Sequence, residues 1–162
     1  MLPRVTIQSE DFDVSQELTA LRGQDARVGA VCSFVGTVRD TRALTGEALD
    51  EVKAMELEHY PGMTEKSIEA MIDAAHQRFD FYNARVVHRV GRLLPADQIV
   101  FVAVTSAHRG ESFKACEFLM DYLKTQAPFW KKEQTPRGAH WVDARVSDDA
   151  ALARWGIAVN NA

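Results

Sequence analysis

The apolar positions of the chain follow two periods, one typical of strands and one typical of helices. Two-residue alternation and short, continuous apolar runs predict seven extended segments. The segment at 29–36 is apolar almost throughout, which favours a strand that is covered on both faces. All the predicted strands are residues 4–8, 29–36, 52–60, 86–90, 99–104, 129–133 and 140–146.

Three helices are predicted between these strands, each with a recognisable start or end. Asp13 is a suitable N-cap for the first helix and Gly23 a suitable end, while Thr64 is a suitable cap for the second. The third helix follows His108 and ends at Pro128, because proline has no N–H and disfavours helical geometry in the residue before it. The apolar stripe of this third helix is predicted to comprise Phe113, Cys116, Met120 and Leu123.

The order of these elements predicts an α+β fold. Adjacent strands are often joined by turns rather than by helices, which argues against a doubly wound parallel sheet, and the chain has no Gly-rich phosphate loop. We expect one domain over residues 1–147 and a tail over residues 148–162 that forms a turn of helix around Trp155. The polar stretch 41–50, which contains Gly46, predicts a mobile loop.

Composition narrows the classes of function. A net charge of −4 provides no overall attraction to nucleic acid or to an anionic membrane, so an anion site would have to be a local cluster. No apolar run approaches the ~20 residues that span a bilayer, and no targeting signal is evident, so a cytoplasmic protein is expected. Cys32 and Cys116 are far apart in the sequence among apolar residues, which favours free thiols over a catalytic thiol. The scattered histidines lack ligand spacing, which argues against a metal site.

Two lysines flank the turn that follows the third helix. Lys124 lies in the last helical turn, and Lys131 follows the Pro-Phe-Trp segment 128–130. A lysine beside apolar rings is placed for chemistry or for binding an anion. Periodicity alone also allows an ordinary solvated surface, on which Lys124 pairs with Asp121 one turn earlier and Lys131 belongs to an exposed strand.

Three further polar residues, Arg39, His108 and Arg109, come directly after apolar strands. Sheets often hold a binding site just beyond the ends of their strands. Helix N-terminal amides beside Arg109 would also suit a phosphate. The alternative for Arg39 is a surface arginine paired with Asp40, and for His108 a residue that only neighbours a helix cap.

Four segments carry a family resemblance. They are residues 34–40 (FVGTVRD), 58–63 (EHYPGM), 106–110 (SAHRG) and 123–131 (LKTQAPFWK). Together they resemble the large, catalytic subunit of molybdopterin synthase, in the right order over residues 4–146. Two positions depart from the family pattern. The loop 41–49 lacks asparagine-glycine character, and Ala96 stands where a glycine often precedes Asp97.

The resemblance implies a fold, an activity and partners. It implies an α/β hammerhead-type fold with an additional small antiparallel sheet, and a homodimer of large subunits within a heterotetramer. The implied partner is a small ubiquitin-like sulfur carrier that ends in a Gly-Gly thiocarboxylate. The implied reaction is a sulfurtransferase step of molybdenum cofactor biosynthesis, in which cyclic pyranopterin monophosphate receives two sulfurs and becomes the dithiolene of molybdopterin. No cofactor of its own is implied.

The resemblance also assigns site residues. Lys124 and Lys131 are the implied catalytic pair, with Lys131 expected to have a depressed pKa and Lys124 to be a permanent cation beside the reacting carbonyl. An arginine of the neighbouring large subunit is expected in the pocket, and Arg145 is the matching position. The implied substrate-binding residues are Thr37, Val38, Arg39, His108, Arg109, Lys124, Lys131, Lys132 and Glu133.

Two other classes of function remain open to test. A non-catalytic module that only binds a ubiquitin-like tail would form product equally well after Lys124 or Lys131 is changed. A phosphate-binding hydrolase is disfavoured, because the sequence shows no phosphate loop, no metal cluster and no nucleophile-base motif.

Overall fold

The computed structural model describes residues 2–43, 49–51, 53–142 and 146–157. All the predicted strands and helices are present with shifted ends, and β3, β4 and β7 are additional short strands. The elements are, in chain order, β1 (Val5–Gln8), α1 (Val14–Arg22), β2 (Ala30–Thr37), β3 (Thr41–Ala43), β4 (Leu49–Glu51), β5 (Ala54–His59), α2 (Met63–Arg78), β6 (Asn83–Arg89), β7 (Gly91–Leu93), β8 (Gln98–Ser106), α3 (Arg109–Gln126), β9 (Phe129–Thr135), β10 (Gly138–Val142) and α4 (Val146–Ala153).

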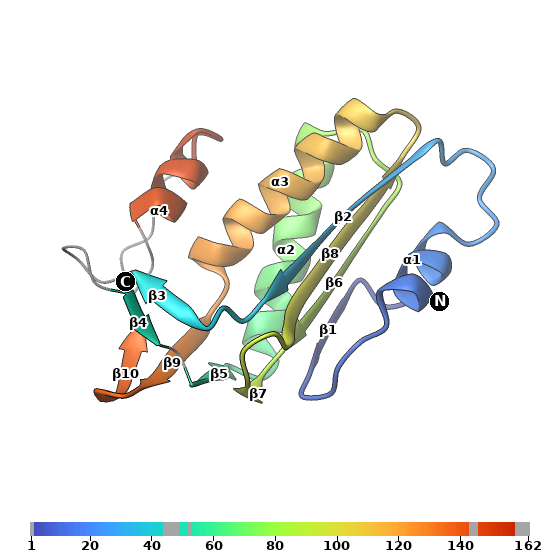
Figure 1. The fold of residues 1–162 in the computed structure, drawn as a ribbon. Helices are drawn as coiled ribbons and strands as arrows, with labels where there is room; N and C mark the ends of the chain where they lie inside the picture. The colour runs from blue at the N-terminus through green and yellow to red at the C-terminus, as the bar shows by residue number, and fades with distance from the viewer. Residues whose placement is uncertain (1, 44–48, 52, 143–145, 158–162) are drawn as a thin grey trace.

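The main sheet has the strand order β1-β6-β8-β2, with β1 parallel to β6 and the other neighbours antiparallel. Helices α2 and α3 cover one face and α1 covers the other (Figure 1). Successive side chains of β8 point to opposite faces of the sheet, so they contribute to two separate parts of the core. Val102 and Val104 pack on the side of α2 and α3, whereas Phe101 and Ala103 pack on the side of α1.

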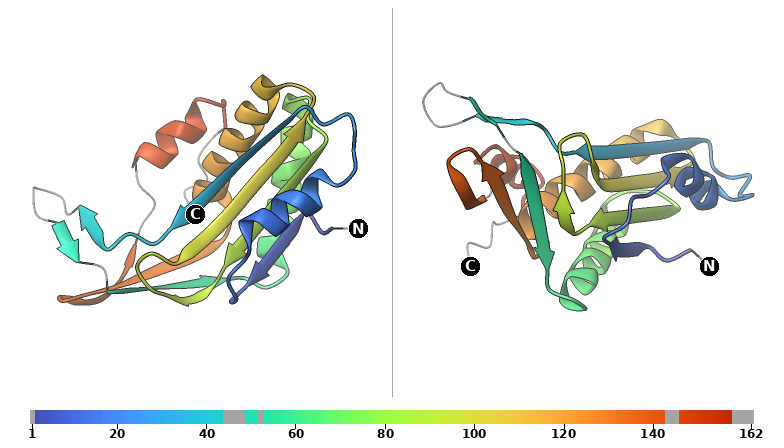
Figure 2. Two further views of the ribbon diagram at one scale, coloured as in Figure 1. Left: turned by 45° about the vertical axis from the view of Figure 1, so that its right-hand side comes forward. Right: turned by 60° about the horizontal axis from the view of Figure 1, so that its bottom comes forward.

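A second, antiparallel sheet has the order β10-β9-β5-β7, and β3 pairs with β4 in a separate ribbon. Figure 2 shows this sheet at the end of the main sheet where β2 ends, with the β3–β4 ribbon projecting beyond it. The predicted α+β fold with an additional small antiparallel sheet is therefore confirmed. No helix in the described ranges is long and apolar enough to cross a membrane.

Strand β2 lies at an edge of the main sheet, so the prediction of a strand covered on both faces is wrong. Within the described residues it pairs with β8 alone, and α3 packs over β8 and β2 together. Val31 and Phe34 are consequently 39% and 41% exposed. The apolar run correctly indicated a strand, but composition does not distinguish a central strand from an edge whose apolar side chains face outward.

The ends of α1 and α2 confirm two predictions and correct one. The Asp13 carboxylate accepts a hydrogen bond from the Gln16 N–H at 3.0 Å, and α1 ends at Gly23 with φ 55°. Helix α2 instead begins after Gly62, whose N–H donates to the Glu65 carboxylate at 2.6 Å. Thr64, the predicted cap, lies inside the first turn and is completely buried.

The buried face of α3 is rotated from the predicted stripe. Cys116, Met120 and Leu123 are buried as predicted, but Phe113 is 59% exposed. Ala115, Phe118 and Leu119 complete the buried face instead. A large aromatic residue at the right helical spacing is therefore not sufficient evidence of burial.

The stretch predicted as a mobile loop contains the paired strands β3 and β4. Residues 44–48, with Gly46, lie outside the described part. Near the C-terminus, the predicted strand 140–146 is shorter, because β10 ends at Val142 and α4 begins at Val146. Beyond α4, Trp155 packs edge-on against Phe79 and Phe118 of the main core.

The two cysteines meet in space although they are far apart in the sequence. Cys116 of α3 is buried in the main core, and the half-buried Cys32 of β2 packs against the same cluster. Both are free thiols, as predicted. Burial, with a further contribution from Cys32, raises the pKa of the Cys116 thiol.

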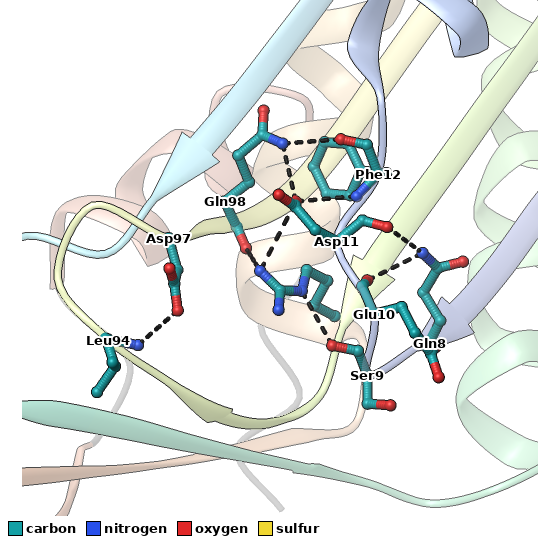
Figure 3. Close-up of polar contacts among 9 residues, drawn as sticks. Gln8, Ser9, Glu10, Asp11, Phe12, Leu94, Asp97 and Gln98 are labelled. Carbon is teal, nitrogen blue, oxygen red and sulfur yellow. Dashed lines mark hydrogen bonds and ion pairs between the residues drawn. The ribbon is translucent and has the colours of Figure 1, made fainter.

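The turn between β7 and β8 contains Ala96 in the left-handed region, with φ 76°. The Asp97 carboxylate accepts a hydrogen bond from the Leu94 N–H at 2.8 Å, which closes the turn (Figure 3). Two backbone hydrogen bonds fix the turn to Val38, from the Val38 N–H to the Asp97 carbonyl and from the Ala96 N–H to the Val38 carbonyl. Side chains with a Cβ are strained in this region.

Replacing Ala96 by glycine should therefore stabilise the protein. Relief of the left-handed strain, about 1–2 kcal/mol, outweighs the added entropy of the unfolded chain, so we expect a net gain of about 0.5–1 kcal/mol in the free energy of unfolding. Urea denaturation measures this gain. The control is Ala20→Gly on the exposed side of α1, which should lose up to about 1 kcal/mol. An Ala96→Gly protein no more stable than the parent would contradict the prediction.

Candidate active site

The candidate active site lies where α3 ends and β9 begins. Lys124 is exposed in the last turn of α3, and the chain turns at Pro128 into β9. Alternation along β9 places Phe129 and Lys131 on one face, with Trp130 on the other. Both lysines therefore belong to the same helix-turn-strand connection, as the sequence predicted.

Thr64 joins this connection to the start of α2. Its hydroxyl oxygen accepts a hydrogen bond from the Tyr60 N–H at 2.9 Å and donates to the Pro128 carbonyl at 3.0 Å. The Phe129 N–H donates to the Ala127 carbonyl at 2.9 Å. A buried hydroxyl that makes two such bonds fixes the proline turn, since breaking either bond would leave a buried polar group unpaired.

His88 lies directly against the first residue of β9. Its ring stacks on the Phe129 ring, with centroids 3.9 Å apart and an interplanar angle of 18°. His88 is 8% exposed, and Nδ1 lies 2.8 Å from the Arg89 carbonyl oxygen. Because a carbonyl only accepts hydrogen bonds, Nδ1 carries the proton.

The electrostatics of His88 show which cations converge on it. Burial lowers the pKa of the His88 imidazole to about 4, against an opposing contribution from the Arg89 carbonyl. The charges of Lys124, His59 and Lys131 lower this pKa further. Lys124 of α3 and Lys131 of β9 thus both contribute positive charge at the same imidazole.

The segment that carries Arg39 reaches the same end of the main sheet. Thr37, the last residue of β2, pairs with Gln98 at the start of β8. Val38 is 3% exposed and belongs to a small core cluster with Leu57, which is the β5 partner of Lys131. Both backbone polar groups of Val38 form hydrogen bonds with the β7–β8 turn. The backbone directly before the exposed Arg39 is therefore held in place.

His108 and Arg109 lie at the opposite end of the main sheet. Strands β2 and β8 are antiparallel, so Ala30 pairs with Ser106 while Thr37 pairs with Gln98. Nine residues of strand separate these ends by about 27 Å, and the 18-residue helix α3 spans a similar distance. Both residues do follow an apolar strand, as Arg39 does, but antiparallel pairing places them far from the two lysines within one chain.

The remaining predicted site residues are dispersed. Lys132 faces the other side of β9, with Nζ 5.6 Å from the centroid of the Trp141 ring. Glu133 is 4% exposed on the same face as Lys131. Arg145 lies outside the described residues. Within the described ranges, no group of acidic, histidine or cysteine side chains could hold a metal ion.

Asp121 does not hold Lys124 in the predicted pair. Its carboxylate accepts a hydrogen bond from the Trp155 indole N–H at 2.8 Å and lies 3.8 Å from the Arg154 guanidinium. Helical spacing correctly placed Asp121 one turn before Lys124. Arg154 and Trp155, which follow α4, contact the Asp121 carboxylate instead, and the periodicity of α3 does not predict these contacts.

Comparison with known proteins identifies the family. The profile of the MoaE protein family matches residues 7–126. The chain belongs to this family. The molybdopterin synthase catalytic subunit of Ralstonia nicotianae is 60% identical over 161 residues, which cover 99% of this chain and 89% of that protein.

Solved structures agree with this membership. The molybdopterin biosynthesis MoaE protein of Burkholderia ambifaria superposes with a TM-score of 0.80 at 56% identity, covering 96% of this chain and 99% of that one. A complex of subunits 1 and 2 of the molybdopterin-converting factor from Helicobacter pylori matches with a TM-score of 0.68 at 18% identity, covering 88% and 92%, and so shows the fold alone. The resemblance seen in the sequence is confirmed, and the chain is an enzyme of molybdenum cofactor biosynthesis.

Sequence reasoning did not single out His88, His59 or Thr64 as part of this site. In the sequence, the two histidines belong to a scattered set without ligand spacing, and Thr64 is a suitable helix cap. The sequence holds one weak signal for the burial of His88. The side chains of β6 alternate, and His88 follows Ala84 and Val86 on the face that α2 and α3 cover. Its contact with Phe129 depends on tertiary packing, which alternation does not reveal.

The depressed pKa of His88 predicts a specific dependence of stability on pH. The unfolded imidazole, with a pKa of 6.5, binds a proton more readily than the folded one at about 4. Stability from this group is therefore complete above pH 6.5 and is lost as the pH falls toward 4, by about 3 kcal/mol in total.

His88→Phe, which cannot titrate, should lose this part of the pH dependence. The free energy of unfolding of both proteins is measured by urea denaturation between pH 7 and pH 4. As the pH falls, the parent should lose about 3 kcal/mol more than His88→Phe. Parallel curves would show that His88 is not held neutral by the fold.

Proposed function

We propose that the connection between α3 and β9 is the catalytic centre of a molybdopterin synthase large subunit. In this proposal it transfers sulfur from a thiocarboxylated small carrier to cyclic pyranopterin monophosphate. The supporting observation is that Lys124 and Lys131 flank a proline turn whose Phe129 ring stacks on the buried His88, in a chain of the MoaE family. Two cations beside apolar rings suit a reaction that develops negative charge on a carbonyl oxygen when the carbonyl carbon is attacked.

The two lysines have different surroundings and different proposed roles. Lys124 is exposed on a helix. After the carrier's sulfur has bonded to the substrate, water attacks the carbonyl carbon of the resulting thioester, and a permanent cation can stabilise the oxyanion that forms before the C–S bond breaks and the carrier leaves as a carboxylate. Lys131 is half-buried beside Phe129 on β9, where an ammonium group can give and regain a proton during sulfur transfer.

The proposed partner is a small ubiquitin-like subunit that ends in Gly-Gly. A two-subunit molybdopterin-converting factor from Helicobacter pylori, which shares this fold, supports the pairing. The carrier's extended glycine tail can lie close to the backbone of the large subunit, because glycine has no side chain. It can therefore carry its terminal carbonyl group into the site. The full assembly in this proposal is a homodimer of large subunits with two small subunits.

The distance between Arg39 and Arg109 bears on the dimer. Within one chain they lie at opposite ends of the main sheet, about 27 Å apart by strand length. If both bind the anionic substrate, a second copy must supply one of them. A two-fold dimer would then hold two composite pockets, each with Arg39, Lys124 and Lys131 from one chain and His108 and Arg109 from the other.

The decisive experiment combines the chain with a thiocarboxylated carrier and cyclic pyranopterin monophosphate and follows dithiolene formation. Dithiolene should appear with the full carrier and fail with a carrier that lacks its two terminal glycines. The truncated carrier, unable to present sulfur, serves as the matched control. Equal product from both carriers would refute tail delivery, and no product from either would refute the proposed reaction.

Substitution of the lysines separates the two proposed roles. Lys124→Ala and Lys131→Ala should each slow a single turnover on the order of 10²-fold, as loss of an oxyanion partner or proton donor does. Lys131→Arg should not recover the rate, because arginine does not release its proton near neutral pH, whereas Lys124→Arg should recover part.

Lys114→Ala, at another exposed position of α3, is the control and should react normally. A Lys131→Arg enzyme with near-normal rate would leave Lys131 a purely electrostatic role. Full activity in both alanine variants would instead favour the non-catalytic binding module.

The arginines should act on substrate binding. Arg39→Ala and Arg109→Ala should raise the substrate concentration for half-maximal rate and leave the saturated single-turnover rate largely intact, because a guanidinium contributes fixed charge and forked donors.

Mixed dimers test whether the pocket is shared. Lys131→Ala and Arg109→Ala chains, unfolded and refolded together, should regain about a quarter of normal activity at low substrate, since half the dimers are mixed and each contains one intact pocket. Activity no greater than the mean of the two separate variants would show that each pocket belongs to one chain.

A further inference from the structure

We propose that His88 is a positioning residue, whose ring supports Phe129 and thereby sets where Lys131 stands relative to Lys124. This inference rests on the proposed roles of the two lysines. It concerns a residue on β6, a strand of the main sheet that contributes neither lysine.

The support begins at the ring contact. His88 and Phe129 are nearly parallel at 3.9 Å, and His88 is buried, so the two rings have little freedom to slide. Phe129 is the first residue of β9, and Lys131 follows two residues later on the same face. A displacement of the Phe129 ring is therefore transmitted to Lys131 through one short, extended segment.

The connection is held from two sides. On one side, the Thr64 hydroxyl binds the Pro128 carbonyl at 3.0 Å. On the other, His88 lies against the ring of the next residue, Phe129. Thr64 fixes the backbone of the turn and His88 fixes the direction in which β9 leaves it. Lys124 enters this connection from the helical side, so its separation from Lys131 depends on both contacts.

His88 is itself anchored through Arg89. Its Nδ1–H donates to the Arg89 carbonyl at 2.8 Å. The Arg89 guanidinium donates to the carbonyls of Ser9 and Gln98 at 3.1 and 2.9 Å and lies 3.7 Å from the Asp11 carboxylate. Figure 3 shows Ser9, Asp11 and Gln98 in this cluster at the end of the main sheet. The strand end that carries the imidazole is thus tied to the N-terminal loop.

The position suits an uncharged ring. The charged or titratable groups that act on His88 come from three elements: Lys124 of α3, His59 of β5 and Lys131 of β9. Its β-sheet neighbours on β1 and β8 are the apolar Ile7 and Val100. From α2, Glu65 faces His59 at 3.7 Å. A charged ring here would repel both lysines, whereas a neutral ring can support Phe129 without disturbing them.

A second stack in the same chain provides a matched control. His76 stacks on Phe81 with centroids 3.9 Å apart and an angle of 16°, almost the same geometry as His88 on Phe129. His76 is exposed at the end of α2, and Phe81 precedes β6 at the opposite end of the main sheet. Loss of this stack reports the cost of losing a histidine–phenylalanine contact at the end of the main sheet opposite Lys124 and Lys131.

The test separates ring support from the hydrogen bond. His88→Phe keeps an aromatic face without the donor, and His88→Asn keeps a donor near Nδ1 without the ring. Single turnovers are measured with the complete synthase, thiocarboxylated carrier and cyclic pyranopterin monophosphate, below the melting temperature of every variant. We expect His88→Asn to slow the saturated rate 10- to 100-fold, as a misplacement of about 1 Å does, with a half-saturating concentration within about twofold.

His88→Phe should stay within about threefold of the parent rate, because the stack is retained. His76→Ala should melt at a lower temperature and react at the normal rate. Equal losses in His88→Phe and His88→Asn, or a normal rate in His88→Asn, would overturn the positioning role. So would a slowing in His76→Ala as large as that in His88→Asn.

Nitrogen NMR of the unmodified protein provides a test without any substitution, so a destabilised variant cannot affect its result. His88 should appear as the neutral Nδ1–H tautomer from pH 8 to pH 5.5. An Nε2–H tautomer, or titration near pH 6.5, would overturn the anchoring through Arg89. Full rates in Lys124→Ala and Lys131→Ala would refute the proposed function itself. Slow lysine variants beside a normal His88→Asn would refute only the positioning role.

Discussion

The hydrogen bond from the Thr64 hydroxyl to the Pro128 carbonyl is the contact on which the site depends most. Proline ends α3 but leaves the following strand free to depart in many directions. Thr64 removes that freedom by joining the turn to the start of α2, more than sixty residues away in sequence. The direction of β9 then sets the position of the second sheet, because β9 is one of its two inner strands and pairs with both β5 and β10.

Antiparallel pairing of β2 with β8 determines how the cations are distributed. It places Arg39 at the end of the main sheet where α3 finishes, and it places His108 and Arg109 where α3 starts. The predicted site residues therefore lie in two groups, one near each end of α3. Such an arrangement suits an enzyme whose pocket is completed by a second copy better than one whose pocket lies within a single chain.

Local signals in the sequence predicted much of this structure. The Asp13 cap, the end at Gly23 and the stop at Pro128 were readable because each depends on residues within one turn. The pairing of Lys124 and Lys131 around the proline turn was readable for the same reason. The edge position of β2 and the burial of Thr64 depend on distant strands and helices, and so did the contact of His88 with Phe129. Antiparallel register, which decides that Arg39 and Arg109 lie apart, also has no local signature.

The placement of the two cysteines, one buried and one half-buried, has a consequence for an enzyme that handles activated sulfur. A protein thiolate could attack the carbonyl carbon of the carrier's thiocarboxylate, which would form an unproductive thioester and expel the sulfur as hydrosulfide. The chain contains only two cysteines, and they pack together beneath α3, where burial keeps the Cys116 thiol protonated. The fold thus keeps the Cys116 thiol unreactive toward the sulfur that the enzyme transfers.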